Sequence, residues 1–399
     1  MQQKFYRKIL KNGMVVLFEK RSVPVVSVAF AVRSGGINEK DSEKGISHFI
    51  EHMLYKGTPS RNAKQIASEI EKNGGVLNGF TDERVTAYYC KMPSKHLILA
   101  LKVLSDMIKN PLFDQKEIEK ERKVIFEEIE MRKDDPKIYV FDRISSFLYD
   151  GSLNMSLIGT KDTMNSLDRG KLLEKFKEVY HPNNMIVAIV GDANFNEIVD
   201  FLEKEFERSK GKVLKPKLNR RNQSFIEKRK GIDQANFIFA YHVPTSNDKK
   251  SFAADVLNTI VAGGMSSRLF TEIREKRNLA YDVKGGGEIN RDFAYNFIYV
   301  GAKKENLELV KKLILEEFEK VSKELSEEEL KQAKEQLVGN YQISMEDSVN
   351  QLSHLLFYEL NSNAKDFYDY EKNVRNVNLK DVKDIAKIKN YSFFALVPE

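Results

Sequence analysis

Cysteine is nearly absent from this sequence. One cysteine, Cys90, occurs among 399 residues, so no disulfide bond can form within the chain. A chain without disulfides is typical of a reducing compartment, and we expect a cytoplasmic protein. Cys90 lies in a segment where apolar and polar residues alternate, as in a strand, which favours a buried structural thiol over a catalytic nucleophile.

Long hydrophobic runs are also missing. The most apolar stretch near the start, residues 23–32, is interrupted by Ser27 and is shorter than the roughly 20 residues that cross a membrane as a helix. The first residues contain neither an apolar segment nor the small-residue cleavage site of a secretory signal. We therefore expect no membrane association and no export by a signal peptide.

Neither sign of charge is in large excess. The 65 Lys and Arg residues and the 59 Asp and Glu residues leave a net charge of +6 at pH 7. The densest basic clusters, at 210–217, 220–221 and 228–230, fall in one polar segment without interleaved aromatic residues or a nucleic-acid-binding motif. We expect no nucleic-acid partner and predict a solvated linker at residues 208–230.

The two parts of the chain on either side of this linker have a similar order of elements. Apolar strands are expected in three pairs, with the members of each pair roughly 210 residues apart: 25–32 and 237–241, 85–92 and 294–300, and 185–190 and 393–397. Amphipathic helices are expected between them, for example at 97–109 and 307–321. Accidental matches between short strands are the alternative. The pattern predicts an α+β fold of two homologous domains, 1–207 and 231–399, each with a mostly antiparallel sheet packed with helices.

The string H-F-I-E-H at positions 48–52 carries the strongest chemical signal. His48, Glu51 and His52 stand in the order H-x-x-E-H of the inverted zinc-protease motif. Positions i, i+3 and i+4 share one face of a helix, so both imidazoles and the carboxylate would point to one place. Neutral histidines bind zinc, and a carboxylate beside them can take a proton from metal-bound water. Chance is the alternative, and because the second half lacks such a string, we expect metal chemistry in the first half alone.

A catalytic zinc site needs a third protein ligand. The other histidines stand singly and are weaker candidates: His96, His181, His242 and His354. A predicted acidic helix at 115–132 is a better source. Glu121 and Glu128 lie two turns apart on its inward stripe, where a carboxylate must be paired or bound to metal, whereas Glu127 points toward solvent.

The same helix carries a family resemblance. Its residues 121–128, E-R-K-V-I-F-E-E, resemble the segment E-R-x-V-I-x-x-E of the pitrilysin-type (M16) zinc metallopeptidases, a family that includes insulin-degrading enzyme and mitochondrial processing peptidase. The last glutamate of that segment is the family's third zinc ligand, and it follows the second histidine at the same distance as Glu128 follows His52. The resemblance, to the small two-domain bacterial type, implies that Glu128 is a zinc ligand and that Glu121 hydrogen-bonds a ligating histidine and orients it.

A second segment resembles the substrate-binding strand of that family. Residues 74–81, G-G-V-L-N-G-F-T, are similar to G-x-x-N-A-[FY]-T, with Gly79 in place of the usual alanine. The resemblance implies that this strand lines the cleft and that Asn78, Gly79 and Phe80 bind substrate. A peptide could then add as a strand to an exposed edge near residues 85–90, although an ordinary core hairpin is the alternative.

A third matching segment lies in the second half. Residues 274–281, R-E-K-R-N-L-A-Y, resemble R-x-x-x-x-L-[AG]-Y. The resemblance implies that Arg274 and Tyr281 reach the zinc site of the first half. Taken alone, Tyr281 would more often be an ordinary strand residue.

Together these residues predict a zinc metalloendopeptidase with one zinc ion per chain. Peptides or unfolded segments would be hydrolysed by attack of zinc-bound water, with Glu51 as general base and with Tyr281 and Arg274 stabilising the oxyanion. The catalytic subunit of a heterodimeric processing peptidase, a non-catalytic interaction protein of the same fold, and a zinc hydrolase for non-peptide amides are alternatives. Manganese or cobalt are alternatives to zinc, since geometry rather than raw affinity selects the metal.

The resemblance also implies an assembly. Larger members of the family join four homologous domains into a closed chamber, and this chain is expected to hold two. We therefore expect a clam-like half of a peptidase chamber. Its partner would be a second copy in a homodimer, or a homologue without the zinc motif in a heterodimer.

Overall fold

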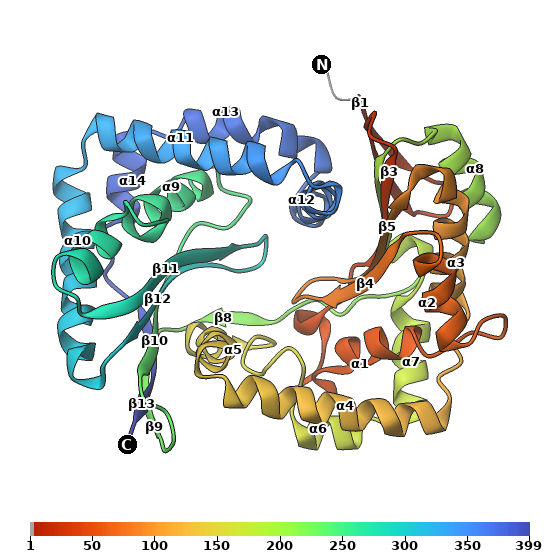
Figure 1. The fold of residues 1–399 in the computed structure, drawn as a ribbon, viewed down its shortest axis with the longest axis horizontal. Helices are drawn as coiled ribbons and strands as arrows, with labels where there is room; N and C mark the ends of the chain where they lie inside the picture. The colour runs from red at the N-terminus through yellow and green to blue at the C-terminus, as the bar shows by residue number, and fades with distance from the viewer. Residues whose placement is uncertain (1–3) are drawn as a thin grey trace. The chain divides into compact units, whose positions relative to one another are not determined.

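The computed structural model describes residues 4–399 and contains two compact units (Figure 1). The units are built from residues 4–130, 155–217 and 344–367 (unit 1) and from residues 131–154, 218–343 and 368–399 (unit 2). Each unit combines a β-sheet with helices and has its own hydrophobic core. This architecture confirms the predicted α+β class.

Six strands form the sheet of unit 1, in the order β1-β2-β7-β3-β5-β4. Their bounds are Lys4–Ile9 (β1), Val15–Lys20 (β2), Val25–Val32 (β3), Val76–Thr81 (β4), Thr86–Pro93 (β5) and Met185–Gly191 (β7). All neighbours pair antiparallel except β2 and β7, which are parallel. The inner strands β3 and β7 are buried on both faces, which explains their nearly continuous apolar sequences. At one side of the sheet, β4 is an edge strand.

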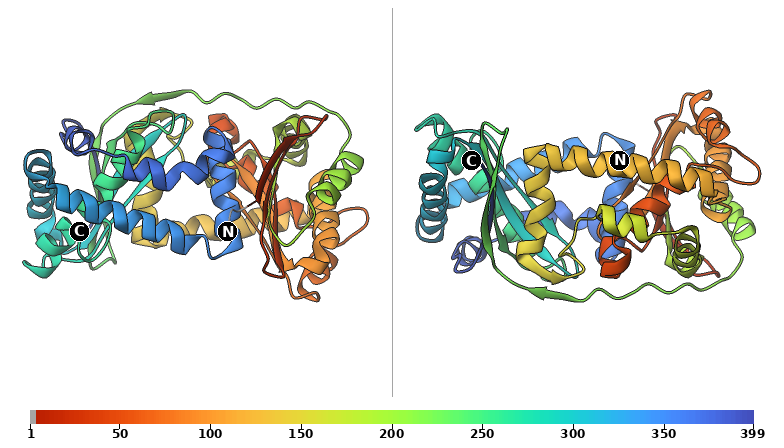
Figure 2. Two further views of the ribbon diagram at one scale, coloured as in Figure 1. Left: turned by 90° about the horizontal axis from the view of Figure 1, so that it is seen from above. Right: turned by 90° about the horizontal axis from the view of Figure 1, so that it is seen from below.

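Helices cover both faces of this sheet. They are α1 (Ile46–Leu54), α2 (Ala63–Glu71), α3 (Leu97–Lys109), α6 (Lys161–Ser166), α7 (Arg169–Val179), α8 (Phe195–Glu205) and α12 (Ser348–Asn361), and α4 (Gln115–Asp134) begins in the same unit. Figures 1 and 2 show α12, in blue, and α3, in orange, on opposite faces of the sheet, and both helices contact β3. Helix α1 packs against β4 and β5.

Unit 2 repeats this design with five strands, in the order β11-β12-β10-β13-β9. Their bounds are Ser224–Arg229 (β9), Ala235–His242 (β10), Ala280–Ile289 (β11), Ala294–Ala302 (β12) and Ser392–Pro398 (β13), beside a small sheet of β6 (Tyr149–Gly151) and β8 (Leu218–Arg220). The helices are α5 (Pro136–Leu148), α9 (Ser251–Ala262), α10 (Leu307–Glu324), α11 (Glu327–Ser344), α13 (Tyr370–Arg375) and α14 (Leu379–Ile385). Figure 1 shows α9 and α5 on opposite faces of the five-stranded sheet.

The strand orders of the two sheets support the predicted repeat. Read from β4, unit 1 has the order β4-β5-β3-β7-β2, and unit 2 has β11-β12-β10-β13-β9. The parallel pair lies at the same end of both series. The three predicted strand pairs therefore occupy equivalent places, as β3 and β10, β5 and β12, and β7 and β13.

The structure differs from the sequence expectation in the polar segment 208–230. This segment contains β8 and β9, and β9 pairs with β13 along its whole length. Because β9 is an edge strand with mostly exposed side chains, its composition is as polar as that of a linker.

Two helices each pack on a sheet that lies on the other side of the predicted domain boundary in sequence. Helix α5 precedes the polar segment yet packs on the sheet of unit 2, and α12 follows it yet packs on the sheet of unit 1. The compact units therefore exchange one helix each, whereas the predicted domains are continuous stretches of sequence. Among the helices of residues 4–399, none has the length and apolar character needed to cross a membrane.

Candidate active site

Helix α1 carries the H-F-I-E-H string and is firmly fixed at its N-terminus. Gly45, just before the helix, has φ +91°, the left-handed conformation that glycine adopts most readily. The buried Glu39 carboxylate accepts hydrogen bonds from the N–H groups of Gly45 (2.9 Å) and Ser47 (2.8 Å). It thereby satisfies donors that the first turn leaves without partners. Phe49 anchors the helix in the core of unit 1.

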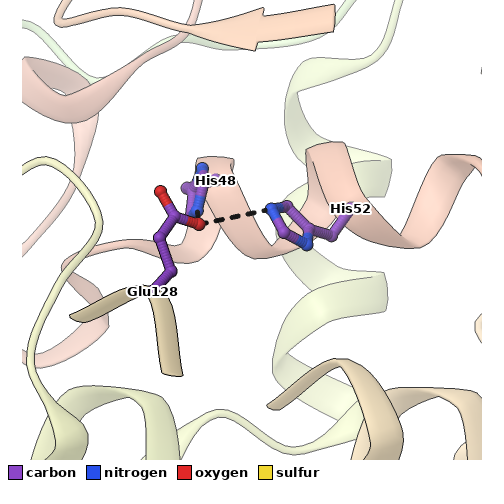
Figure 3. Close-up of side chains that lie close together, drawn as sticks. All are labelled: His48, His52 and Glu128. Carbon is purple, nitrogen blue, oxygen red and sulfur yellow. Dashed lines mark hydrogen bonds and ion pairs between the residues drawn. The ribbon is translucent and has the colours of Figure 1, made fainter. Parts of the chain in front are cut away.

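Three possible metal ligands converge between α1 and α4. Figure 3 shows His48, His52 and Glu128 pointing toward one another, and one donor atom of each lies within 4.8 Å of the others. Glu128 Oε2 lies 3.1 Å from His48 Nε2 and 3.8 Å from His52 Nε2. Donors at about 2.0–2.1 Å from a tetrahedral zinc ion are about 3.3 Å apart. The two separations lie on either side of this value, so the donor set fits zinc.

Glu121 lies behind this group and contacts one of its histidines. Its Oε2 is 3.2 Å from His52 Nδ1, which leaves His52 Nε2 directed toward Glu128. Its Oε1 is 2.5 Å from the ammonium of Lys56. Burial alone would raise the pKa of Glu121, but the hydrogen bonds from His52 and Lys56 outweigh it and lower the pKa. A charged Glu121 is thus held within hydrogen-bond distance of His52 Nδ1.

His48 is strongly influenced by carboxylates. Burial works to lower its pKa, but Glu128 and Glu51 outweigh burial and raise the pKa to about 9. In the metal-free protein the imidazole is therefore protonated at neutral pH. A cation at this position would replace a proton that the two carboxylates already stabilise.

Glu51 is directed toward strand β4 rather than toward Glu128. The side chain is buried, and its Oε2 accepts a hydrogen bond of 2.8 Å from Thr81 Oγ1 at the end of β4. The same oxygen lies 3.7 Å from His48 Nδ1. The carboxylate is thus fixed beside the three possible metal ligands without being one of these converging donors.

The predicted substrate residues lie on the edge strand of the sheet. Asn78 is exposed, and its Oδ1 accepts a 2.8 Å hydrogen bond from the N–H of Gly79. Gly79 faces Glu51, and the Phe80 ring lies 6.3 Å from that of Tyr89. The alternatives for this region were an exposed edge strand and an ordinary core hairpin. Strand β4 is the edge strand, whereas β5 pairs with a strand on each side.

Arg274 and Tyr281 lie together in unit 2. Arg274 belongs to a π-helix, Phe270–Glu275, and Tyr281 follows at the start of edge strand β11. The guanidinium carbon of Arg274 lies 5.3 Å from the centre of the Tyr281 ring, and Tyr281 is 75% exposed. Both residues line a hollow of about 500 Å³ on this unit. Their pairing has the proximity that a joint role requires, and their action at the metal site stays a prediction.

Two contacts at the site were missed by sequence reasoning. Thr81 lies inside the matched segment 74–81, and strand alternation places it on the same side as Gly79, toward α1. Lys56 lies just beyond the C-terminal end of α1 and pairs with Glu121. The strand alternation was readable from the sequence, but the partners Glu51 and Glu121 depend on the tertiary fold.

Three of the four singly placed histidines have ordinary hydrogen-bond partners. His181 lies within hydrogen-bond distance of Ser209 Oγ, His242 of the Tyr149 hydroxyl, and His354 of Ser344 Oγ. Within residues 4–399, His48, His52 and Glu128 form the one group of three or more His, Cys, Asp or Glu side chains able to hold a metal ion.

Comparisons with known proteins agree with this geometry. Residues 14–161 match the family described as Insulinase (Peptidase family M16), and residues 166–337 match the Peptidase M16 inactive domain. A protein of Rickettsia felis described as an uncharacterized zinc protease is 34% identical over 353 residues, covering 87% of this chain and 85% of its own length. The uncharacterized zinc protease YmxG of Bacillus subtilis is 30% identical over 387 residues, covering 96% of this chain and 94% of its own.

A solved structure shows the same fold. The crystal structure of a protease from Helicobacter pylori superposes with a TM-score of 0.92 and 24% sequence identity. The match covers 99% of this chain and 100% of that one. At this identity, the comparison supports the fold and not the chemistry.

Proposed function

The chain belongs to peptidase family M16, whose relatives here are named zinc proteases, and we propose that it is a zinc metalloendopeptidase acting on peptides or unfolded polypeptide segments. The observation that supports this most directly is the convergence of His48, His52 and Glu128 beside a separately held carboxylate, that of Glu51. Three ligands leave one position free, as catalytic zinc sites require.

His48, His52 and Glu128 would hold the ion, and Glu121 would keep His52 in the orientation that presents Nε2. When bound, zinc supplies Lewis acidity that makes water a nucleophile near neutral pH. Glu51 would take the proton of the attacking water and deliver it to the leaving amine. Its hydrogen bond from Thr81 restricts the carboxylate to one side of the ligand group.

Strand β4 is the proposed substrate strand. Its free edge can pair with an extended peptide, and backbone pairing depends little on side-chain identity. The N–H of Gly79 is already hydrogen-bonded to the Asn78 side chain, so a peptide carbonyl can replace that acceptor without leaving a polar group unpaired. We expect modest sequence selectivity and a preference for unstructured substrates.

Arg274 and Tyr281 are the proposed oxyanion-stabilising pair. Tyr281 offers an exposed phenol, and the neighbouring guanidinium adds a positive charge that favours a developing negative oxygen. The same residues would also contact the substrate backbone. The proposed assembly is a homodimer, or a heterodimer in which this chain supplies the metal residues, and the proposed location is the cytoplasm.

Hydrolysis of an unstructured peptide library by the wild type and by Glu51→Gln tests the proposal, with zinc content measured on both proteins. We expect the wild type to cleave and to lose activity to a chelator. Glu51→Gln should keep its zinc and lose about 10²–10⁴ in rate, since it removes the proton acceptor but no ligand. Glu127→Gln, on the exposed side of α4, is the matched control and should behave as wild type.

The outcomes separate the alternatives. Zinc binding without cleavage by the wild type would favour a heterodimer that lacks its partner, and the search would turn to a homologue without the motif. Equal cleavage by the wild type and Glu51→Gln would refute the assignment of Glu51. A chain that binds no zinc would favour the non-catalytic interaction protein.

A further inference from the structure

Tyr55, at the C-terminal end of α1, has an unusual hydroxyl group. The oxygen is buried and makes no hydrogen bond within the described structure. Nearly all buried polar groups in proteins are hydrogen-bonded, so such a group calls for an explanation. Burial, followed by the negative charge of Glu51, raises the pKa of Tyr55, so the hydroxyl keeps its proton and remains a donor.

The hydroxyl lies against the backbone of Gly79 in β4. A Cβ atom at position 79 would overlap the Tyr55 hydroxyl oxygen. It would also lie 2.9 Å from the carbonyl oxygen of Ala87 and 3.1 Å from Glu51 Oε1. The hydroxyl of Tyr55 and the carboxylate of Glu51 thus border the same small space, which is open only because residue 79 has no side chain.

The contact between α1 and β4 also bears on Glu51 directly. Thr81, two residues beyond Gly79 on the same face of β4, donates a 2.8 Å hydrogen bond to Glu51 Oε2. Glu51 Oε1 faces Gly79. Both carboxylate oxygens are therefore placed by β4, and a shift of this strand away from α1 would move the carboxylate.

We propose that the Tyr55 hydroxyl and the missing side chain of Gly79 form a matched pair that sets the spacing between α1 and β4, and that Tyr55 is a positioning residue for Glu51. The hydroxyl occupies the volume that a methyl group on β4 would need. This assignment rests on the proposed function, in which Glu51 is the proton acceptor. Tyr55 itself acts through Glu51, because its hydroxyl oxygen is buried.

A double-mutant cycle tests the pair with the zinc-loaded protein: Tyr55→Phe, Gly79→Ala and the double variant. Gly79→Ala should lower kcat about tenfold or more and lower the unfolding temperature, since the methyl group has no room beside the hydroxyl. Tyr55→Phe should lower kcat less, with KM and zinc content unchanged. The double variant should recover most of the loss in kcat and in unfolding temperature that Gly79→Ala causes. Recovery should stop short of the values of Tyr55→Phe, because the methyl group still lies 2.9 Å from the carbonyl oxygen of Ala87.

Tyr88→Phe is the matched control. Tyr88 neighbours Tyr55 in the same core, but its hydroxyl is 2.7 Å from that of Tyr180 and so already has a partner. Combined with Gly79→Ala, it should rescue neither activity nor unfolding temperature. If Gly79→Ala alone gives no folded protein, recovery of folded protein in the double variant with Tyr55→Phe would equally support the pairing of Tyr55 with Gly79.

Additive effects on the unfolding temperature would overturn the pairing. Recovery of the unfolding temperature without recovery of kcat would overturn the positioning role. A wild type that cleaves no peptide would refute the proposed function, and the unfolding temperatures would still decide whether Tyr55 and Gly79 are a pair. Failure of the inference and failure of the function are thus distinguishable.

Discussion

At the scale of single residues, the candidate site depends on three carboxylates that lie outside the converging group of His48, His52 and Glu128. Glu39 fixes the start of α1, Glu121 fixes one ring of the ligand group, and Glu51 is held by Thr81. Each is buried, and each has its partners within hydrogen-bond distance. A buried carboxylate is costly unless it is paired, so these contacts keep the site in one arrangement before any ligand binds.

Glu121→Gln should weaken zinc binding about 10–100-fold. The substitution removes the charged acceptor 3.2 Å from His52 Nδ1 and leaves Lys56 without its ion-pair partner. Competition with a chromophoric chelator measures the affinity. Glu127→Gln, on the exposed side of the same helix, is the control and should bind zinc as the wild type does. An unchanged affinity in Glu121→Gln would show that His52 needs no such support.

At the scale of secondary-structure elements, α12 is attached to the sheet of unit 1 by polar contacts. Arg7 makes two hydrogen bonds to Glu359, of 2.8 and 2.7 Å, and Arg33 reaches the same carboxylate at 3.2 Å. Ser348 Oγ lies 2.8 Å from Ser27 Oγ in the buried interface. These contacts select the position of a helix that apolar packing alone would allow to slide.

Glu359→Gln should lower the free energy of unfolding of unit 1 by about 2 kcal/mol, less than the roughly 3–5 kcal/mol for a fully buried pair, because both arginines are partly exposed. Urea unfolding measures the change, and hydrogen exchange of the α12 amides localises it. Glu203→Gln, which breaks the exposed 3.8 Å pair with Lys8, should cost less than about 1 kcal/mol. Equal effects of the two variants would argue against a special role for Glu359.

The sequence predicted those elements whose physical signal is local. Strand Val25–Val32 and strand Met185–Gly191 are buried on both faces, so their apolar runs were unmistakable. The spacing of His48 and His52 on α1 was equally local, since helical periodicity aligns it. Helical periodicity on α4 marked Glu121 and Glu128 as candidates, and the choice of Glu128 as the third ligand came from the family resemblance. The strand Ser224–Arg229 was missed because an exposed edge strand has a linker's composition. The bond from Thr81 to Glu51 could not be predicted from local patterns, because it depends on how the hairpin packs on α1.

At the scale of the whole molecule, the exchange of α5 and α12 is the feature that sequence patterns could not indicate. An amphipathic helix shows that it needs an apolar surface, but its sequence does not say which sheet supplies that surface. Each sheet in fact receives one helix from the other half of the chain. Folding of the two halves is therefore coupled, although each unit has its own core.

This coupling predicts the behaviour of fragments. Residues 1–217 produced alone should be poorly folded and bind zinc weakly. Without α12, the face of β3 that carries Ser27, Ala29 and Ala31 loses its cover, and α5 loses the sheet on which it packs. Co-production with residues 218–399 should restore a complex that copurifies and binds zinc as the intact chain does. A cut after residue 217 breaks no strand, so the effect is not due to a damaged element.

The matched control is the full-length chain with a protease site inserted at residues 210–217 and cleaved after folding. Its two pieces should stay together and keep their zinc, because α5 and α12 are already packed on their sheets before the cleavage. Circular dichroism, size-exclusion chromatography and zinc content distinguish the three preparations. If residues 1–217 alone matched the intact chain in folding and zinc affinity, α12 would be dispensable for unit 1. The two halves would then fold as the independent, continuous domains that the sequence pattern first suggested.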